Sequence, residues 1–109
     1  ADTYKSHQKT RIDSICAVLW DEDNNQFRDW NFRYKCFGNL NIASNFIPLW
    51  LVCDDEEFKA KQKKLVKALN ESNLICGGGI VTSLYNTGEQ WDYPNCWAPI
   101  NHMIIEGLY

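Results

Sequence analysis

The first twenty residues carry apolar side chains at the spacing of one helix face. Over residues 4–20 these positions recur every three or four residues, and the charged side chains lie away from them. The pattern predicts a helix with one face against a core. Because no N-cap residue comes before it, we expect the helix to start upstream of residue 1. The apolar stripe consists of Ile12, Ile15, Cys16 and Leu19.

A polar turn and a short extended segment follow this helix. Residues 21–26 are polar and predict the turn, whereas residues 27–37 alternate aromatic with polar side chains. A period of two is typical of a strand or hairpin, and Gly38, Asn39 and Asn41 interrupt it. We therefore expect a short extended element or hairpin near residues 27–37.

Two helices are predicted in the middle of the chain. Residues 43–53 form a compact apolar segment that indicates a buried helix with Pro48 in its first turn. We expect Ser44 or Asn45 to cap this helix. In residues 54–71 acidic side chains come first and lysines follow, a distribution that the helix dipole favours. The lysines indicate a solvated face rather than a site for a polyanion. The apolar stripe of the second helix consists of Phe58, Leu65 and Leu69.

A long loop, residues 76–97, comes before a last helix that starts near Ala98, with Pro99 in its first turn. The glycine triplet at residues 77–79 predicts a turn with positive φ. It is a weak candidate for an anion-binding nest, because no Lys, Ser or Thr follows at the spacing of a phosphate-binding loop. Residues 80–84 indicate a brief extended stretch. The chain as a whole is predicted to be mainly α.

Composition is typical of one globular domain. The chain has 109 residues, 45% hydrophobic and 23% charged, which excludes a disordered protein. Its net charge of −3 excludes recruitment of nucleic acid by a basic surface. The longest apolar stretch, residues 46–53, is far shorter than the ~20 residues that span a bilayer. The aromatic content of 14% indicates a site with flat apolar surfaces.

The cysteines form no recognisable metal or disulfide pattern. No Cys-x-x-Cys pair occurs, and a zinc site with His7 and His102 would need ligands from remote positions. The cysteines are widely spaced and odd in number, which disfavours a disulfide scaffold. We therefore expect them to be free thiols that are buried as small apolar side chains. We expect His102 to be a hydrogen-bonded structural residue rather than a base. The cysteines are Cys16, Cys36, Cys53, Cys76 and Cys96.

The densest cluster of polar and aromatic side chains covers residues 89–97. Sugar sites use this mixture, because flat rings stack on C–H faces while amides and carboxylates bond paired hydroxyls. Pro94 stiffens the segment. The alternative interpretation is structural: the tryptophans fill the core and Asp92 bonds nearby backbone N–H groups. Composition leaves both interpretations open.

The same region supplies few carboxylates for glycosidase chemistry. That chemistry needs a protonated and an ionised carboxyl, ~5–5.5 Å apart for retention or ~6.5–9.5 Å for inversion. The candidates are Glu89, Asp92 and Glu106. Their spacing identifies none of them as the acid, so a complete catalytic pair is not predicted here.

Residues 90–99 resemble the second signature of the trehalases of glycoside hydrolase family thirty-seven, in which Gln-Trp-Asp is followed by Pro and then by Trp before a Pro. Residues 78–84 and 105–108 resemble the family's Gly-Gly-Ile-Pro-Thr-Ser-Leu and Ile-Glu-Gly-Leu stretches. Residues 43–50 and 19–22 also fit. Val81, Gly77 and Cys96 depart from the family pattern, where Pro, Pro and a small residue are usual.

The resemblance implies that this chain is a segment of an (α/α)6 barrel. The complete enzyme of this family hydrolyses α,α-trehalose to two glucose molecules with inversion, and the resemblance implies no metal or organic cofactor. By residue-by-residue transfer the family's acid and base lie outside this chain, so no catalytic residue is assigned. Residues 1–109 are expected to form a partial catalytic domain, incomplete at both ends, that supplies part of the pocket wall. The signature gives these substrate-binding candidates: Gln90, Trp91, Asp92, Asn95 and Trp97.

The partners that the resemblance implies are trehalose and the remaining barrel segments. A slice of a barrel exposes apolar faces, so we expect those segments or self-association to cover them, and we expect no nucleic acid. Many animal members of the family are secreted or membrane-tethered, and nothing in this segment indicates either. The alternative is a trehalase-derived module without hydrolysis, which binds sugar or another protein.

Overall fold

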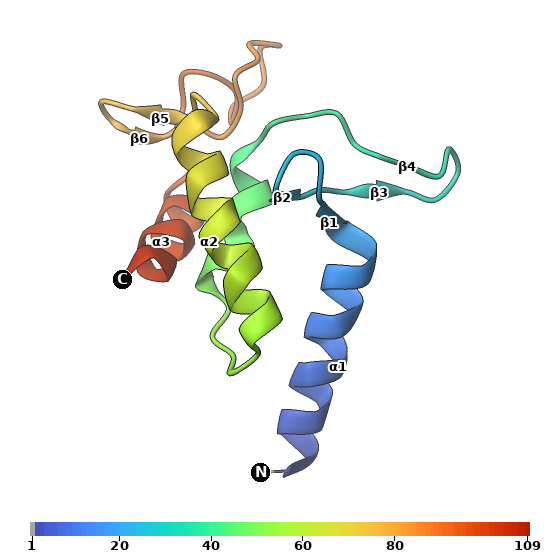
Figure 1. The fold of residues 1–109 in the computed structure, drawn as a ribbon. Coiled ribbons are helices and arrows are strands. Elements are labelled where there is room, and N and C mark those ends of the chain that lie inside the picture. Colours follow the sequence, from blue (N-terminus) through green and yellow to red (C-terminus); the bar gives the residue numbers. More distant parts are fainter. Residues whose placement is uncertain (1) are drawn as a thin grey trace.

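The computed structural model describes residues 2–109 as a mainly helical chain with small hairpins (Figure 1). Its long N-terminal helix, α1 (Asp2–Leu19), extends from the centre of the molecule to the N-terminus. On the other side, α2 (Glu56–Glu71) and α3 (Ala98–Leu108) pack around the 3-10 helix η1 (Ala43–Trp50). The expected mainly helical architecture is therefore confirmed for this segment.

The strands form three antiparallel hairpins within residues 2–109. The pairs are β1 (Trp20–Asp21) with β2 (Gln26–Phe27), β3 (Trp30–Asn31) with β4 (Cys36–Phe37), and β5 (Ile75–Cys76) with β6 (Gly79–Ile80). The β3–β4 pair confirms the hairpin expected near residues 27–37, and it projects from the body of the molecule (Figure 1). The β1–β2 pair surrounds the expected polar turn.

Helix α1 confirms the predicted N-terminal helix, with a start two residues earlier and an end one residue earlier than expected. Ile12 is buried, whereas Ile15, Cys16 and Leu19 are partly buried against the core. The prediction had Trp20 as the last residue of this helix, and that is wrong. Trp20 begins β1 instead, because its ring packs edge-on against Phe27 at 4.9 Å between centroids.

The buried helix expected over residues 43–53 is a 3-10 helix that ends at Trp50, and neither expected cap is used. Ile42 is the N-cap residue and makes no side-chain cap hydrogen bond. Ser44 is exposed, and the Asn45 side chain is buried among residues of other segments. Its Nδ2 donates to Gln26 Oε1 at 3.2 Å and to the Leu40 carbonyl at 3.1 Å. Neither Ser44 nor Asn45 caps the helix, because η1 begins at Ala43 and both lie inside it.

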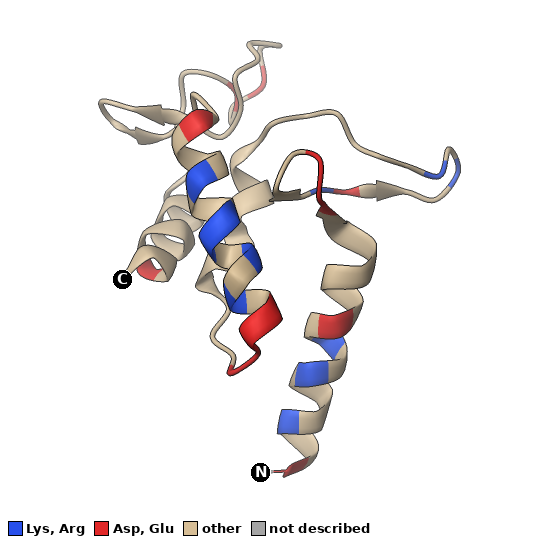
Figure 2. Ribbon diagram, viewed as in Figure 1, with Lys and Arg blue, Asp and Glu red and all other residues tan. Residues whose placement is uncertain are grey.

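Helix α2 confirms the prediction for residues 54–71 except at its first two residues. Asp55 is the N-cap, and its carboxylate accepts from the Phe58 N–H at 2.9 Å. Figure 2 shows the lysine positions along the helix, with acidic residues at its start. Lys61 is the exception to a solvated face. Its side chain is only 14% exposed, and its Nζ lies 5.8 Å from the centre of the Trp20 ring.

The core lies between α2, α3 and η1. Its fully buried side chains are Phe46, Phe58, Leu65, Leu69, Leu74, Val81 and Ile104. Among these are the three stripe residues that the sequence predicted for α2. Helix α3 confirms the last predicted helix, with Pro in its first turn. At Gly107 it approaches η1 so closely that a Cβ would lie 2.4 Å from the Leu49 carbonyl carbon.

The glycine triplet does not open a long loop as expected. It closes the β5–β6 hairpin, in which Cys76 lies opposite Gly79. The expected positive φ occurs at Gly79, at 134°, whereas Gly77 and Gly78 do not need it. The irregular segment therefore starts after β6, at residue 81, and the expected extended stretch is limited to β6 and a single bridge between Ser83 and Ile42.

The expectation that the cysteines are buried is wrong. Three of them are exposed, two are half-buried, and all five are free thiols. The reason is their position: Cys36 and Cys76 lie at exposed positions of the β3–β4 and β5–β6 hairpins, and Cys96 lies at an exposed position of the loop before α3. Partial burial raises the pKa of the Cys16 thiol. The expectation of a bonded His102 is also wrong, since its side chain is exposed on α3 and makes no hydrogen bond to residues 2–109.

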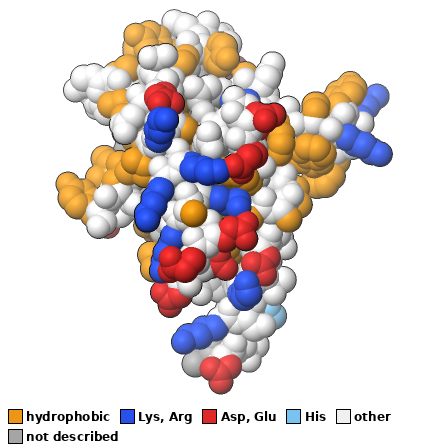
Figure 3. Space-filling view, viewed as in Figure 1, with side chains coloured by type: hydrophobic (Ala, Val, Ile, Leu, Met, Phe, Trp, Pro, Cys, Tyr) orange, Lys and Arg blue, Asp and Glu red, His pale blue; other side chains and the backbone are white. Residues whose placement is uncertain are grey.

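The described residues leave large apolar side chains on the surface, as expected. Figure 3 shows them gathered on the β3–β4 hairpin and along the opposite edge of the same face. The most exposed are Tyr4, Phe32, Tyr34, Val52, Trp91, Trp97, Ile75 and Tyr109. No helix among residues 2–109 is both long and apolar enough to cross a membrane.

Candidate functional site

The segment between β6 and α3, residues 81–97, carries the signature residues and is here called the signature loop. Its centre is Asp92, which is 7% exposed. The Asp92 Oδ2 accepts hydrogen bonds from the Thr87 N–H at 2.5 Å, from the Thr87 hydroxyl, and from the Glu89 N–H at 3.4 Å. One carboxylate oxygen therefore gathers three donors of its own loop.

These donors favour the ionised form of Asp92. The Thr87 hydroxyl and then the Thr87 N–H hold the pKa of the Asp92 carboxyl below its usual range. A carboxylate with this environment accepts hydrogen bonds and does not supply a proton near neutral pH. The structural interpretation of Asp92, as a partner of nearby backbone N–H groups, is confirmed.

The other half of the structural interpretation is wrong, because the tryptophans do not fill the core. Trp91 and Trp97 are each 56% exposed. Tyr85 and Tyr93 in the same loop are also exposed, at 46% and 45%. The signature loop therefore presents several flat apolar rings to its surroundings, held by a buried carboxylate. Such rings are able to stack on the C–H faces of a sugar.

Backbone hydrogen bonds fold the loop back on itself. The Asp92 N–H donates to the Glu89 carbonyl at 3.1 Å, and the Asn95 N–H donates to the Asp92 carbonyl at 2.8 Å. The Asn95 side chain donates to the Gln90 carbonyl at 2.9 Å. Asn95 thus supports the turn that contains Trp91, whereas the Gln90 side chain is exposed.

The three carboxylates considered for catalysis lie in different settings. Asp92 is tied to its own loop, and Glu89 lies in the same turn with an exposed side chain. Glu106 is exposed on α3. The two glutamates are therefore open to solvent, and only Asp92 is buried.

Sequence reasoning missed one residue that organises this region, Asn101 in the first part of α3. Its Oδ1 accepts from the Ile80 N–H at 2.8 Å, and its Nδ2 donates to the Ile80 carbonyl at 2.8 Å. The Nδ2 also donates to the Trp97 carbonyl at 3.2 Å. The only signal in the sequence is an asparagine inside a predicted helix, where its helix propensity is poor.

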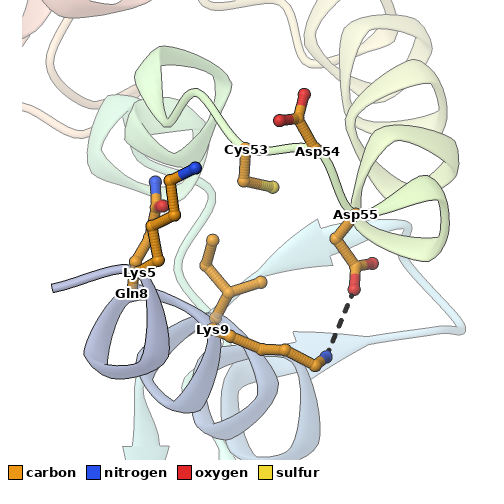
Figure 4. A pocket seen from close by; sticks show the side chains of 7 residues that line it. Lys5, Gln8, Lys9, Cys53, Asp54 and Asp55 are labelled. Atoms are coloured by element: carbon orange, nitrogen blue, oxygen red, sulfur yellow. Dashed lines mark ion pairs between the residues drawn. The ribbon is translucent and has the colours of Figure 1, made fainter. Parts of the chain in front are cut away.

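A separate cavity of about 350 Å³ lies between α1 and the segment that leads into α2 (Figure 4). It is lined by Lys5, Gln8, Lys9, Ile12, Cys53, Asp54 and Asp55. Lys9 Nζ lies 3.6 Å from Asp55 Oδ2 and 3.1 Å from Asp13 Oδ1, so these two carboxylates pair with Lys9. No cluster of three metal-ligating side chains occurs among residues 2–109.

Comparison with known proteins identifies the family. Residues 1–109 match the Trehalase family model. The chain is 37% identical over 125 residues to the probable trehalase of Oryza sativa subsp. japonica, covering 99% of this chain and 22% of that protein. It is 37% identical over 109 residues to the trehalase of Oryctolagus cuniculus, covering 99% of this chain and 18% of that protein.

A solved structure of a trehalase is also similar to this chain. The neutral trehalase of Saccharomyces cerevisiae is similar with a TM-score of 0.68 and 31% identity, over 92% of this chain and 19% of the yeast chain. The present chain thus spans about a fifth of the length of the relatives that it matches. Since the family model matches the chain throughout, the chain belongs to the trehalase family.

Proposed function

We propose that this chain acts as part of an α,α-trehalase that hydrolyses trehalose to two glucose molecules with inversion. In this proposal it is a segment of an (α/α)6 barrel, and it supplies pocket wall rather than the catalytic acid and base. The observation that carries the proposal is the signature loop, which presents Trp91 and Trp97 from a turn organised by Asp92.

The proposed roles follow from exposure and hydrogen bonding. Trp91 and Trp97 offer rings that stack on the apolar faces of glucose units. The exposed Gln90 amide offers both a donor and an acceptor to sugar hydroxyls. Asp92 and Asn95 brace the loop, because Asp92 Oδ2 accepts from loop donors and Asn95 Nδ2 donates to the Gln90 carbonyl.

Inversion needs one carboxylic acid at the glycosidic oxygen and one carboxylate that activates water. Asp92 does not suit the acid role, since three donors of its own loop stabilise its charged form. The side chains of Glu89 and Glu106 are exposed to solvent. We therefore assign both catalytic groups to parts of the enzyme outside these 109 residues.

Barrel neighbours would also cover the apolar side chains that this segment exposes. Val52 is 86% exposed, and Ile105 and Leu108 of α3 are 46% and 47% exposed. Large exposed apolar groups of this kind are typical of surfaces that pack against another element. We propose that the remaining barrel segments pack there in the full-length enzyme.

The proposal is tested by Trp91→Ala in the full-length trehalase that contains this segment. If Trp91 contacts the sugar in both ground and transition states, KM for trehalose rises about tenfold while kcat changes little. Glucose release at varied trehalose concentration measures both constants. Tyr4→Ala is the matched control, because Tyr4 is an aromatic residue 81% exposed on α1, outside the signature loop. An unchanged KM for Trp91→Ala in a folded enzyme would contradict the assignment.

A further inference from the structure

Asn101 connects the two ends of the signature loop. Ile80 comes directly before the loop and Trp97 is its last residue. The single carboxamide of Asn101 bonds the N–H and the carbonyl of Ile80, both at 2.8 Å, and the carbonyl of Trp97 at 3.2 Å. One side chain therefore bonds three backbone groups of two residues, Ile80 and Trp97, which are seventeen positions apart along the chain.

The paired bonds to Ile80 imitate a neighbouring β-strand. Strand β6 pairs with β5 on one side, so the Ile80 N–H and carbonyl on its other edge need partners elsewhere. The planar carboxamide presents an acceptor and a donor side by side, as a strand residue does. Asn101 thereby joins the start of α3 to the edge of the β5–β6 hairpin.

Gly79 provides the space for this contact. A Cβ at this position would lie 2.9 Å from Asn101 Oδ1, closer than a real Cβ contact allows. The φ of 134° at Gly79 also disfavours any residue with a side chain. The hairpin glycine and the helix asparagine are therefore complementary, although they lie 22 positions apart in the chain.

A second layer of backbone bonds closes the loop just above this contact. The Thr82 N–H donates to the Asn95 carbonyl at 3.1 Å, and the Ala43 N–H donates to the Thr82 carbonyl at 2.9 Å. The base of the loop is thus connected to η1 as well as to α3. With the base fixed at Ile80 and Trp97, the turn that carries Trp91 has few ways to move relative to the core.

We propose that Asn101 is a positioning residue for the sugar-contacting loop. It acts through backbone groups and does not contact substrate. By holding Ile80 and Trp97 at a fixed separation, it orients the Trp91 and Trp97 rings toward the pocket. This inference rests on the proposed function of the signature loop. Displacements of about 1 Å at a site of this kind are able to reduce turnover by up to two orders of magnitude.

The test uses three variants of the full-length trehalase that contains this segment. Asn101→Leu keeps the size of the side chain and removes all three bonds. Asn101→Gln keeps the carboxamide. Asn70→Leu makes the same chemical change at an exposed position of α2 and is the matched control. Two quantities are measured: kcat and KM for trehalose, and the exchange rate of the Ile80 amide proton, which Asn101 protects.

We expect Asn101→Leu to accelerate Ile80 exchange and to lower kcat/KM about tenfold. Asn101→Gln restores kcat/KM to within about threefold of wild type, and Asn70→Leu matches wild type. If Asn101→Leu does not fold, Asn101→Asp takes its place with the tenfold loss of kcat/KM as its one readout, because it keeps the acceptor for the Ile80 N–H and loses both donors.

Wild-type kcat/KM in a folded Asn101→Leu enzyme would overturn the proposal, whether or not Ile80 exchange accelerates. Equal losses in the leucine and glutamine variants would also overturn it, since the carboxamide would then not be the cause. Failure of the proposed function gives a different result: the wild-type enzyme does not release glucose from trehalose, or Trp91→Ala leaves KM unchanged.

Discussion

At the residue scale, Asp92 determines the shape of the signature loop. Its Oδ2 collects the N–H and hydroxyl of Thr87 and the N–H of Glu89, all within five positions in the chain. These short-range bonds were within reach of sequence reasoning, because Asp commonly bonds nearby backbone donors in turns. The exposure of Trp91 and Trp97 could not be predicted from the sequence, because it depends on how the whole loop packs on the core.

The lowered pKa of Asp92 predicts a pH dependence of the loop. The folded carboxyl has a lower pKa than the unfolded one, so the stabilisation is fully present above the ordinary Asp value of ~3.9 and is lost as the pH falls through the folded pKa. Below that range the Thr87 N–H faces a neutral carboxyl, which is a weaker acceptor than the carboxylate. We expect protection of the Thr87 amide against hydrogen exchange, corrected for intrinsic rate, to fall in acid.

The same measurement on Asp92→Asn provides the control, because an amide does not titrate in this range. Its Thr87 protection is expected to be low and independent of pH. Equal pH profiles for the wild type and Asp92→Asn would show that another group controls the loop.

At the element scale, the most demanding contact is the crossing of α3 and η1 at Gly107. Alanine usually stabilises a helix relative to glycine by up to ~1 kcal/mol. At Gly107, however, the added Cβ would lie 2.4–2.6 Å from backbone atoms of Leu49 and Trp50, so the two helices have to separate. We expect Gly107→Ala to lower the free energy of unfolding by about 1–3 kcal/mol.

Denaturant unfolding followed by circular dichroism measures this loss. Gly78→Ala is the matched control, because a Cβ at Gly78 meets nothing within 4 Å and the residue does not need positive φ. It is expected to be neutral or slightly stabilising, by at most ~1 kcal/mol. If the two variants have equal stability, the close approach of α3 and η1 is not required for the fold.

The elements that sequence could predict are those with local determinants. Helix α2 has its N-cap Asp55 and its apolar stripe within one segment, and it was predicted nearly to its ends. The predicted cap of η1 was wrong because the helix begins at Ala43, and the Asn45 amide bonds Gln26, nineteen positions away. The role of Asn101 was missed for the same reason, since its partner Ile80 lies 21 positions away. The prediction that the cysteines are buried was wrong because composition does not show which residues lie on hairpins.

At the scale of the whole molecule, the segment is more open than a compact domain of this length. Its radius of gyration is 14.6 Å, against ~13 Å for a compact chain of 100 residues. Helix α1 and the β3–β4 hairpin both extend from the core (Figure 1). This shape, and a length about a fifth that of its relatives, agree with our proposal that the segment packs against the rest of a longer enzyme.

The central claim is that these residues form pocket wall and contain neither the acid nor the base. It is tested most directly by measuring glucose release from trehalose by the purified 109-residue chain, with circular dichroism to establish that it is folded. The account predicts a folded chain that releases no glucose. Release that follows the protein through purification and disappears with Asp92→Asn or Glu106→Gln would contradict it, because a catalytic carboxylate would then lie within this segment.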